Sequence, residues 1–202
     1  MKTENVVLMR MAKESLKGQW GLAIGTFIVY FLVVGAVQAP TMFYPPSGLI
    51  SLIIAGPMAV GISIFALALS RKQNPNLGQI FGGFYNFGTA LGTYLLMLLF
   101  VMLWMLLLIV PGIIAALSYS MTFFILAEDT TISPMQAIDK SKAMMDGYKA
   151  KLFRLYLRFI GWSLLCILTL GIGFFWLIPW VQITMAKFYD DIKTNQISTE
   201  SI

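Results

Sequence analysis

Long runs of apolar residues without charge dominate the pattern of this chain. The longest, from Gln73 to Ala127, contains no Asp, Glu, Lys or Arg. As one helix it would measure about 80 Å at ~1.5 Å per residue, whereas the hydrocarbon core of a membrane is roughly 30 Å thick. The chain must therefore fold back within this run. Val110-Pro111-Gly112 interrupts it, because proline lacks an N–H and glycine lets the backbone reverse. This pattern predicts a helical hairpin over residues 93–127.

Two further hairpins are predicted on either side. Residues 19–70 contain spans at Gln19–Ala39 and Leu49–Ser70, separated by an uncharged outer loop from Pro40 to Gly48. The alternative for the first span is a cleaved signal peptide ending at Val37-Gln38-Ala39, but Pro40 directly after that site disfavours cleavage. Residues 152–189 form either a hairpin that turns at Gly171-Ile172-Gly173 or one tilted span over Phe159–Ala186. Residues 190–202 are predicted to be a polar, disordered tail.

A short polar or amphipathic segment precedes each hairpin. Residues 1–18 are predicted to contain a helix with Leu8, Met11, Ala12, Ser15 and Leu16 on its apolar face. Residues 71–92 are predicted to be an interfacial segment with Phe81, Phe84 and Phe87 toward lipid. In residues 128–151, Ser133-Pro134-Met135-Gln136 is a capping box that predicts a helix up to about Asp146, stopped by Gly147. Such helices either lie in the headgroup layer or pack on the rest of the protein.

The positions of the charged residues predict the topology. All 14 Lys and Arg residues lie before the first span, between the second and third, in or beside the segment between the fourth and fifth, or after the sixth. None lies in the three outer loops, so the positive-inside rule predicts six spans with both termini in the cytoplasm. The basic side of the membrane is therefore expected to be the cytoplasmic side. We expect anionic headgroups to contact basic residues, namely Arg10, Lys13, Lys17, Lys140, Lys142, Lys149 and Lys151.

Composition supports one membrane domain over residues 1–202 and disfavours most enzyme chemistry. The chain is 58% hydrophobic and 11% charged, has a net charge of +5, and contains no His and one Cys. These counts exclude an internal disulfide, a multi-Cys metal site and a histidine base. No basic nucleic-acid fold motif accompanies the charge, so nucleic acid is not an expected partner. We expect no catalytic residue and no cofactor.

A threefold repeat is a further interpretation. Trp20–Thr26 and Phe87–Thr93 match at four of seven positions, including the pairs Gly21 with Gly25 and Gly88 with Gly92. These glycine pairs are candidates for close helix packing, either within the chain or in a dimer. A proline, expected to break the helix, stands in the second helix of each hairpin: Pro57, Pro111 and Pro179. Chance similarity in so biased a composition is the alternative to a repeat.

The carboxylates Glu128, Asp129, Asp190 and Asp191 end the fourth and sixth predicted spans. Negative charge at a helix C-terminus opposes the helix dipole by about 0.3 to 1 kcal/mol. We therefore expect compensation by Arg71 and Lys72, which end the second span. A divalent-cation site formed by these carboxylates is the weaker alternative.

Several motifs resemble a known family. They are LKGQWGLAIG, GPMAVG, FGGFYNFGTALGTYLLM, PGIIAALSYSM, AIDKSKAMMDGYK and LRFIGWSLLCILTLGIGFFWLIPW. Their order resembles a bacterial integral-membrane family, domain-of-unknown-function family 975. The resemblance implies six spans in a bacterial cytoplasmic membrane and carries over no catalytic residue. The architecture is more faintly similar to the membrane region of some glycerophosphodiester phosphodiesterases.

The expected function is non-enzymatic. We expect an accessory or scaffold that organises lipid or a partner membrane protein in the envelope, with protection against membrane-active peptides as one role. The alternative is a small permease or lipid-translocating protein, with Ser118, Ser120, Gln182 and Thr184 along a polar seam. A continuous polar groove between hairpins would favour translocation, and a closed apolar core would favour the scaffold.

Overall fold

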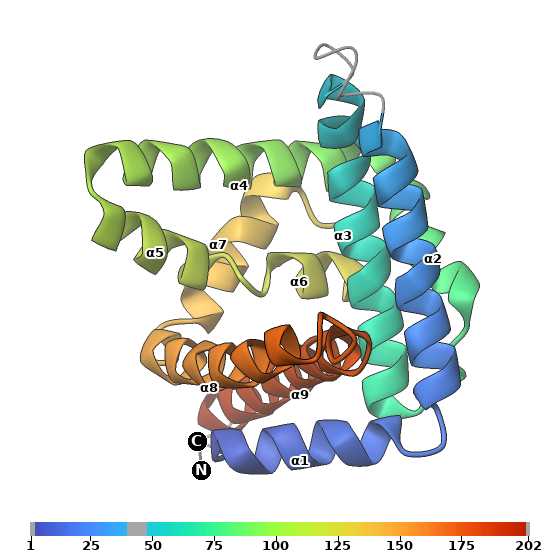
Figure 1. Cartoon of the computed structure of the whole chain (residues 1–202). Helices are drawn as coiled ribbons and strands as arrows, with labels where there is room; N and C mark the ends of the chain where they lie inside the picture. Colours follow the sequence, from blue (N-terminus) through green and yellow to red (C-terminus); the bar gives the residue numbers. More distant parts are fainter. Residues whose placement is uncertain (1–2, 40–47, 201–202) are drawn as a thin grey trace.

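The computed structural model describes residues 3–39 and 48–200, apart from the side chains of residues 197–200. Every regular element in these ranges is a helix, which confirms the all-α class (Figure 1). The elements are α1 (Asn5–Leu16), α2 (Trp20–Gln38), α3 (Gly48–Arg71), the 3₁₀ helix η3 (Leu77–Phe84), α4 (Phe87–Leu107), α5 (Ile109–Ser118), α6 (Thr122–Glu128), α7 (Pro134–Met144), α8 (Lys149–Leu168) and α9 (Phe174–Glu200). The predicted outer loop lies, except for Gly48, outside the described residues.

Four helical segments in the described part of the chain are long and apolar enough to cross a membrane. They are Trp20–Gln38, Gly48–Arg71, Phe87–Leu107 and Ile109–Glu128. The third hairpin differs because basic residues occupy the first half of α8 and charged residues the second half of α9. The uncharged part of α8 runs only from Phe159 to Leu168, about 15 Å at ~1.5 Å per residue. By length and composition, therefore, the third hairpin is the most weakly defined membrane element.

The second hairpin turns earlier than predicted and contains a second break. α4 ends at Leu107, and extended backbone at Leu108 (φ −162°) makes the turn. Pro111 lies in the first turn of α5, where a missing N–H is harmless because no intrahelical acceptor is available there. The predicted fourth span is itself interrupted between α5 and α6, around Tyr119. Sequence hydrophobicity cannot indicate this break, because the residues on both sides are apolar.

A serine from another helix stabilises the break between α5 and α6. The Ser141 hydroxyl on α7 donates to the Ser118 carbonyl at 2.8 Å and accepts from the Met121 N–H at 3.2 Å. Both backbone groups lose a helical partner where the helix is interrupted, and Ser141 is fully buried. One side chain thus satisfies two groups that would otherwise be buried without a hydrogen bond.

The predicted helix breaks at Pro57 and Pro179 do not occur. Pro57 lies within the continuous helix α3, and Pro179 lies within the continuous helix α9. A membrane helix tolerates proline where neighbouring groups and local adjustment compensate for the lost hydrogen bond. Both prolines are buried, so they act as packing residues within their helices.

Close helix packing uses different glycines from those predicted. A Cβ atom added at Gly21, Gly25 or Gly88 would meet nothing within 4 Å, and one at Gly92 would only touch Pro134 Cγ at 3.4 Å. In contrast, a Cβ at Gly61 would overlap the carbonyl oxygen of Ile80. One at Gly83 would overlap the Pro57 carbonyl, and one at Gly56 would crowd the Ala90 carbonyl. The backbones of α3, η3 and α4 therefore meet at Gly56, Gly61 and Gly83.

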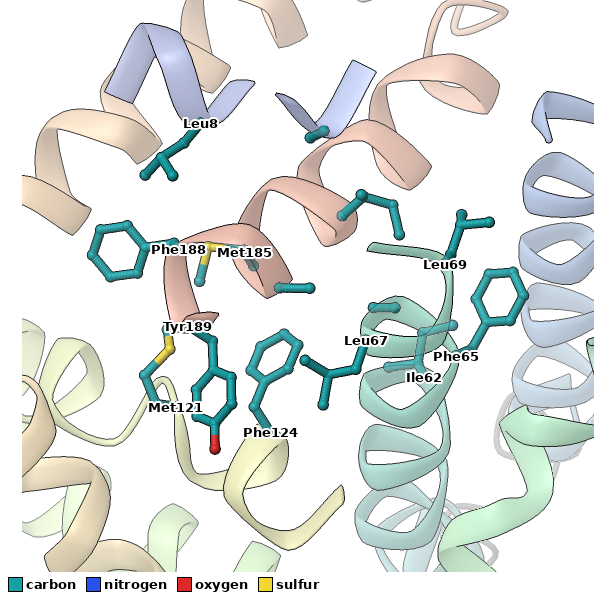
Figure 2. Close-up of a cluster of buried hydrophobic side chains, with 14 of the residues drawn as sticks. Leu8, Ile62, Phe65, Leu67, Leu69, Met121, Phe124, Met185, Phe188 and Tyr189 are labelled. Atoms are coloured by element: carbon teal, nitrogen blue, oxygen red, sulfur yellow. The ribbon is translucent and has the colours of Figure 1, made fainter. Parts of the chain in front are cut away.

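The core lies where α1, α3, α6 and α9 meet. Figure 2 shows buried side chains from these four helices in one cluster, among them Leu8, Leu67, Phe124, Phe188 and Tyr189. The Phe124 and Tyr189 rings are stacked with centroids 5.6 Å apart. The Trp180 indole N–H donates to the Met9 carbonyl at 2.8 Å and fastens α9 to α1. The first helix is therefore part of the core.

The two amphipathic helices pack on protein, which was the second of the two alternatives. The buried face of α1 consists of Leu8, Met9, Ala12, Ser15 and Leu16, so Met9 replaces the predicted Met11, which is exposed. The capping box before α7 is confirmed. The Ser133 hydroxyl accepts from the Gln136 N–H, and the Gln136 side chain accepts from the Ser133 N–H at 3.1 Å. Gly147 follows α7 with φ of +70°.

The third hairpin follows one of the two alternatives, whereas the C-terminal tail differs from the prediction. The chain turns between α8 and α9, with positive φ at Leu170 and Gly171, so the single tilted span is excluded. α9 then continues to Glu200, where we expected a disordered tail. Ile192 is buried against the core, which explains why the helix extends past the membrane-like segment.

The hairpins radiate from the core and do not form a parallel bundle. In Figure 1 the α4–α5 hairpin extends sideways from the α2–α3 hairpin, and α8 and α1 lie below the α4–α5 hairpin. Toward the tips the apolar side chains are exposed, including Leu103, Leu107, Leu164 and Leu168. Phe81, Phe84 and Phe87 are exposed as predicted. The outer halves of the hairpins therefore present apolar surface to their surroundings.

Candidate functional site: a layer of charged residues at the inner helix ends

Charged side chains from α3, α6, α8 and α9 gather beside the core. We call this group the charged layer. Its charged members are Arg71, Glu128, Lys151, Lys187, Asp190, Asp191 and Lys193, and the neutral Tyr189 belongs to it because its hydroxyl bonds Glu128. Each of these residues follows or interrupts an apolar stretch of the sequence. Because the apolar stretches pack together in the core, the polar residues beside them also come close to one another. The start of the described chain also reaches this layer, because the Thr3 hydroxyl donates to the Asp191 carboxylate.

Arg71, at the end of α3, joins the end of α6 to the middle of α9. Its Nη2 lies 2.6 Å from Glu128 Oε1 and 2.5 Å from Asp190 Oδ1, and its Nε donates to Asp190 at 3.1 Å. A guanidinium holds two carboxylates well because its donors are fixed in one plane. The predicted compensation by Arg71 is thus confirmed. Lys72 forms no ion pair within the described ranges.

The second oxygen of Glu128 is also occupied. Lys193 Nζ lies 2.5 Å from Glu128 Oε2, and the Tyr189 hydroxyl donates to the same oxygen at 2.6 Å. Sequence reasoning missed both partners. Their spacing of four on one face of α9 was the available signal, hidden because residues 190–202 were interpreted as a tail.

A second ion pair is the most buried of the layer. Lys151 Nζ lies 2.7 Å from Asp191 Oδ2, and the two side chains are only 10% and 8% exposed. The Lys151 ammonium also lies 5.2 Å from the centre of the Phe188 ring. The Asn5 amide donates to the Lys151 carbonyl at 2.9 Å. Lys151 was predicted to contact headgroups, but Asp191 already neutralises its charge inside the protein.

The C-terminus of α3 is satisfied by two other helices. The Ser70 carbonyl accepts from Lys187 Nζ at 2.6 Å and from the Ser15 hydroxyl at 3.1 Å. A cation at a helix C-terminus interacts favourably with the helix dipole. The layer thus anchors α1 and α9 to the end of α3.

The four carboxylates proposed as weak metal ligands do not converge on one point. Glu128, Asp190 and Asp191 are paired with cations. Asp129 accepts from the N–H and hydroxyl of Thr131, which keeps its pKa below the ordinary value, with a smaller contribution from nearby Lys140. No group of three metal-binding side chains occurs in the part of the chain that the structure describes. Glu128, Asp190 and Asp191 therefore join helices, whereas Asp129 stabilises the loop after α6.

The remaining basic candidates separate into exposed and partly buried residues. The exposed ones are Arg10, Lys13, Lys17, Lys140 and Lys142, whereas Lys149 is half-buried. The sequence interpretation omitted Arg154 and Arg158, which are exposed on α8. They line a groove with the start of α1. Their spacing of four on a helix that enters an apolar run was the missed signal.

Hydroxyl groups of the proposed polar seam bond their own helices. Ser118 Oγ donates to the Ile114 carbonyl at 2.8 Å, and Thr184 Oγ1 donates to the Trp180 carbonyl at 2.7 Å. Ser120 Oγ bonds the Leu117 carbonyl in the same manner. These groups are therefore internally satisfied and do not need a transported substrate as a hydrogen-bond partner.

The fold and the charged layer define a small all-helical protein with several helices apolar enough to span a membrane. The family described as "Protein of unknown function (DUF975)" matches residues 1–116 and 105–196, and the chain belongs to this family. No curated protein and no solved structure matches it. The fainter similarity to glycerophosphodiester phosphodiesterases is not shown by these comparisons.

Proposed function

We propose that this protein is a non-enzymatic membrane scaffold that organises lipid or a partner protein in the bacterial cytoplasmic membrane. One observation carries the proposal. The hairpins are fastened to one another at their inner ends, through the core and the charged layer, while their outer halves diverge with apolar side chains exposed. A body of this shape offers much lipid-facing surface on a rigid base, which suits lipid or partner contact.

In this proposal all three hairpins enter the membrane, and both termini are cytoplasmic. The hydrogen bond between Thr3 and Asp191 places the start of the described chain beside α9, so α1 and the second half of α9 lie on the same side of the protein (Figure 1). A threefold repeat is supported by the order of elements, because α1, η3 and α7 each precede a hairpin. The interruption between α5 and α6 and the different position of Pro111 set the second unit apart.

Thiol labelling tests this topology. In a Cys166→Ala background, single cysteines replace Ser47, Lys72, Lys142 and Asn195. We expect a membrane-impermeant reagent to label only position 47 in intact cells, because the other three lie with the charged layer or its neighbouring segments. External labelling at position 195 would contradict the six-span arrangement.

A lipid-translocation assay tests the scaffold function. The purified protein is reconstituted into vesicles that contain fluorescent phosphatidylglycerol, and an impermeant quencher is added outside. A scaffold leaves the inner-leaflet fluorescence protected, as in protein-free vesicles. We also expect slower dye release when a cationic amphipathic peptide is added. Quenching of both leaflets would contradict the scaffold.

The second candidate, a small permease or lipid-translocating protein, has one observation in its favour. A cavity of about 240 Å³ lies between α2, α3 and α4, and its polar side chains are Tyr30, Gln38, Ser51 and Tyr94. The buried Ser51 hydroxyl has no hydrogen-bond partner among the described residues. None of the residues lining this cavity belongs to the charged layer. Ser51→Ala in the quenching assay separates the two functions, because only a translocation path would be altered.

A further inference from the structure

A groove separates the start of α1 from the first half of α8. Its volume is about 580 Å³, within the roughly 300–1,000 Å³ range of small-molecule sites. Its polar side chains are those of Thr3, Glu4, Asn5, Lys151, Arg154 and Arg158. The two walls are fixed to each other by the hydrogen bond from Asn5 to the Lys151 carbonyl. The groove is thus a defined feature of the fold.

The groove carries unneutralised positive charge. Lys151 is paired with Asp191, so its charge is compensated. Arg154 and Arg158 form no ion pair with any described side chain, and Arg154 Nε donates only to the Ala150 carbonyl of its own helix at 3.3 Å. Glu4 lies in the same groove without pairing to either arginine. Two guanidinium groups and one carboxylate leave one net positive charge, which complements one phosphodiester.

An apolar surface adjoins these two arginines on α8. Phe153, Leu157, Ile160 and Leu164 are exposed and recur at spacings of three and four, so they share one side of the helix. Arg158 is the last charged residue before the uncharged stretch from Phe159 to Ala186. Arginine near the end of a membrane segment places its charge at headgroup level and its aliphatic part along apolar surface. The groove therefore offers positive charge to a lipid headgroup, and the adjoining side of α8 offers apolar surface to an acyl chain.

We propose that this groove binds one anionic phospholipid of the surrounding membrane. Arg154 and Arg158 hold the phosphate with charge-assisted hydrogen bonds, and an acyl chain lies along Phe153, Leu157 and Ile160. The proposal deepens the lipid-organising function and rests on the membrane location proposed above. It places a specific site on α8, whereas the exposed lysines of α7 provide only diffuse attraction to an anionic surface.

Native mass spectrometry of the full chain in detergent tests the site. The added probes are phosphatidylglycerol and phosphatidylcholine with identical chains, and inorganic phosphate. We expect the wild-type protein to retain one phosphatidylglycerol in preference to phosphatidylcholine. Arg154→Gln with Arg158→Gln should weaken phosphatidylglycerol binding about tenfold or more, because the charged donors to the phosphate are lost. Glu4→Gln should strengthen binding.

The matched control is Lys140→Gln with Lys142→Gln, which removes the same charge from exposed positions outside the groove. It should change phosphatidylglycerol binding less than twofold. An equal loss in both double variants would overturn the site and leave the scaffold function standing, since the attraction would then be diffuse. The proposed site would also be overturned if the protein retained phosphatidylglycerol and phosphatidylcholine equally. Displacement of the lipid by inorganic phosphate would overturn it as well.

Folding of the variants is checked by thermal unfolding without added lipid. If the double glutamine variant is unstable, Arg154→Lys with Arg158→Lys replaces it. This variant keeps the charge but loses planar, bidentate donation, so we expect an intermediate affinity. Unchanged affinity for the lysine variant, with a stable fold, would mean that the guanidinium geometry is not used and would contradict the proposed contacts.

Discussion

Both halves of α3 are apolar in sequence, but the inner half is buried and the outer half is largely exposed. In α3, nearly every residue from Gly56 to Ser70 is buried, whereas Leu49, Ile50 and Ile53 near the other end are exposed. The same change occurs along α8, where Leu152 and Leu155 are buried. Beyond Phe159, most apolar side chains of α8 are exposed.

This difference indicates what holds the helices together. In a membrane, lipid tails solvate an apolar side chain as well as another helix does, so hydrophobicity does not bring helices together. The inner ends are joined instead by close backbone approach, buried ion pairs and side-chain bonds to backbone groups. Substitutions at those three features should therefore affect stability most, and matched changes elsewhere should affect it little.

The largest effect is expected at Gly61. Gly61→Ala places a methyl group on the Ile80 backbone, which cannot move away as a flexible side chain would. We expect a loss of about 4 kcal/mol or more, the range of severe core defects. Gly25→Ala meets open space and should instead stabilise its helix by about 0.5–1 kcal/mol. Thermal unfolding in detergent measures both, and a similar loss in the two variants would contradict this comparison of the glycines.

The next largest effect is expected at the buried ion pair. Lys151→Met leaves Asp191 buried without its cation, which should destabilise the protein by about 3–5 kcal/mol. Lys193→Met removes an ion pair whose lysine is 44% exposed, with an expected loss of about 0–1 kcal/mol. Unfolding by denaturant in detergent gives both values. Equal losses would mean that burial of the pair is not the deciding factor.

Ser141→Ala should have an intermediate effect. It leaves the Ser118 carbonyl and the Met121 N–H without a partner, with an expected loss of about 1–3 kcal/mol. The matched control is Ser163→Ala on α8, because Ser163 only bonds the Phe159 carbonyl of its own helix. Hydrogen exchange at Met121 should accelerate in the first variant. No change in that exchange would show that Ser141 does not support the break.

The smallest effect of the series is expected at the cap of α7. Ser133→Ala removes the side-chain acceptor for the Gln136 N–H and should lower stability by about 1 kcal/mol, as is usual for an N-cap. Circular dichroism with thermal unfolding measures the loss. Ser133→Asp serves as the control, since aspartate is also a good N-cap and should retain the wild-type stability.

Local patterns in the sequence determined the class of the protein, its helices and the capping of α7. Uncharged runs, spacing of apolar residues and a capping box act over a few turns, so they need no knowledge of distant contacts. Compensation of Glu128 and Asp190 by Arg71 was also predictable, because opposite charges at neighbouring helix ends must find partners. The glycines that pack could not be identified this way. Gly21 and Gly25 have the right spacing, but only the fold shows that Gly61 faces another backbone.

Tertiary structure alone decided the interruption near Tyr119, the burial of Lys151 and the continuation of α9 to Glu200. Each depends on a group distant in sequence: Ser141 for the interruption, Asp191 for Lys151, and the core around Ile192 for α9. A polar residue is equally compatible with lipid headgroups, water or a buried partner until the chain folds. Hydrophobicity therefore set the helices along this chain, and the pairing of its few polar groups decided how they were joined.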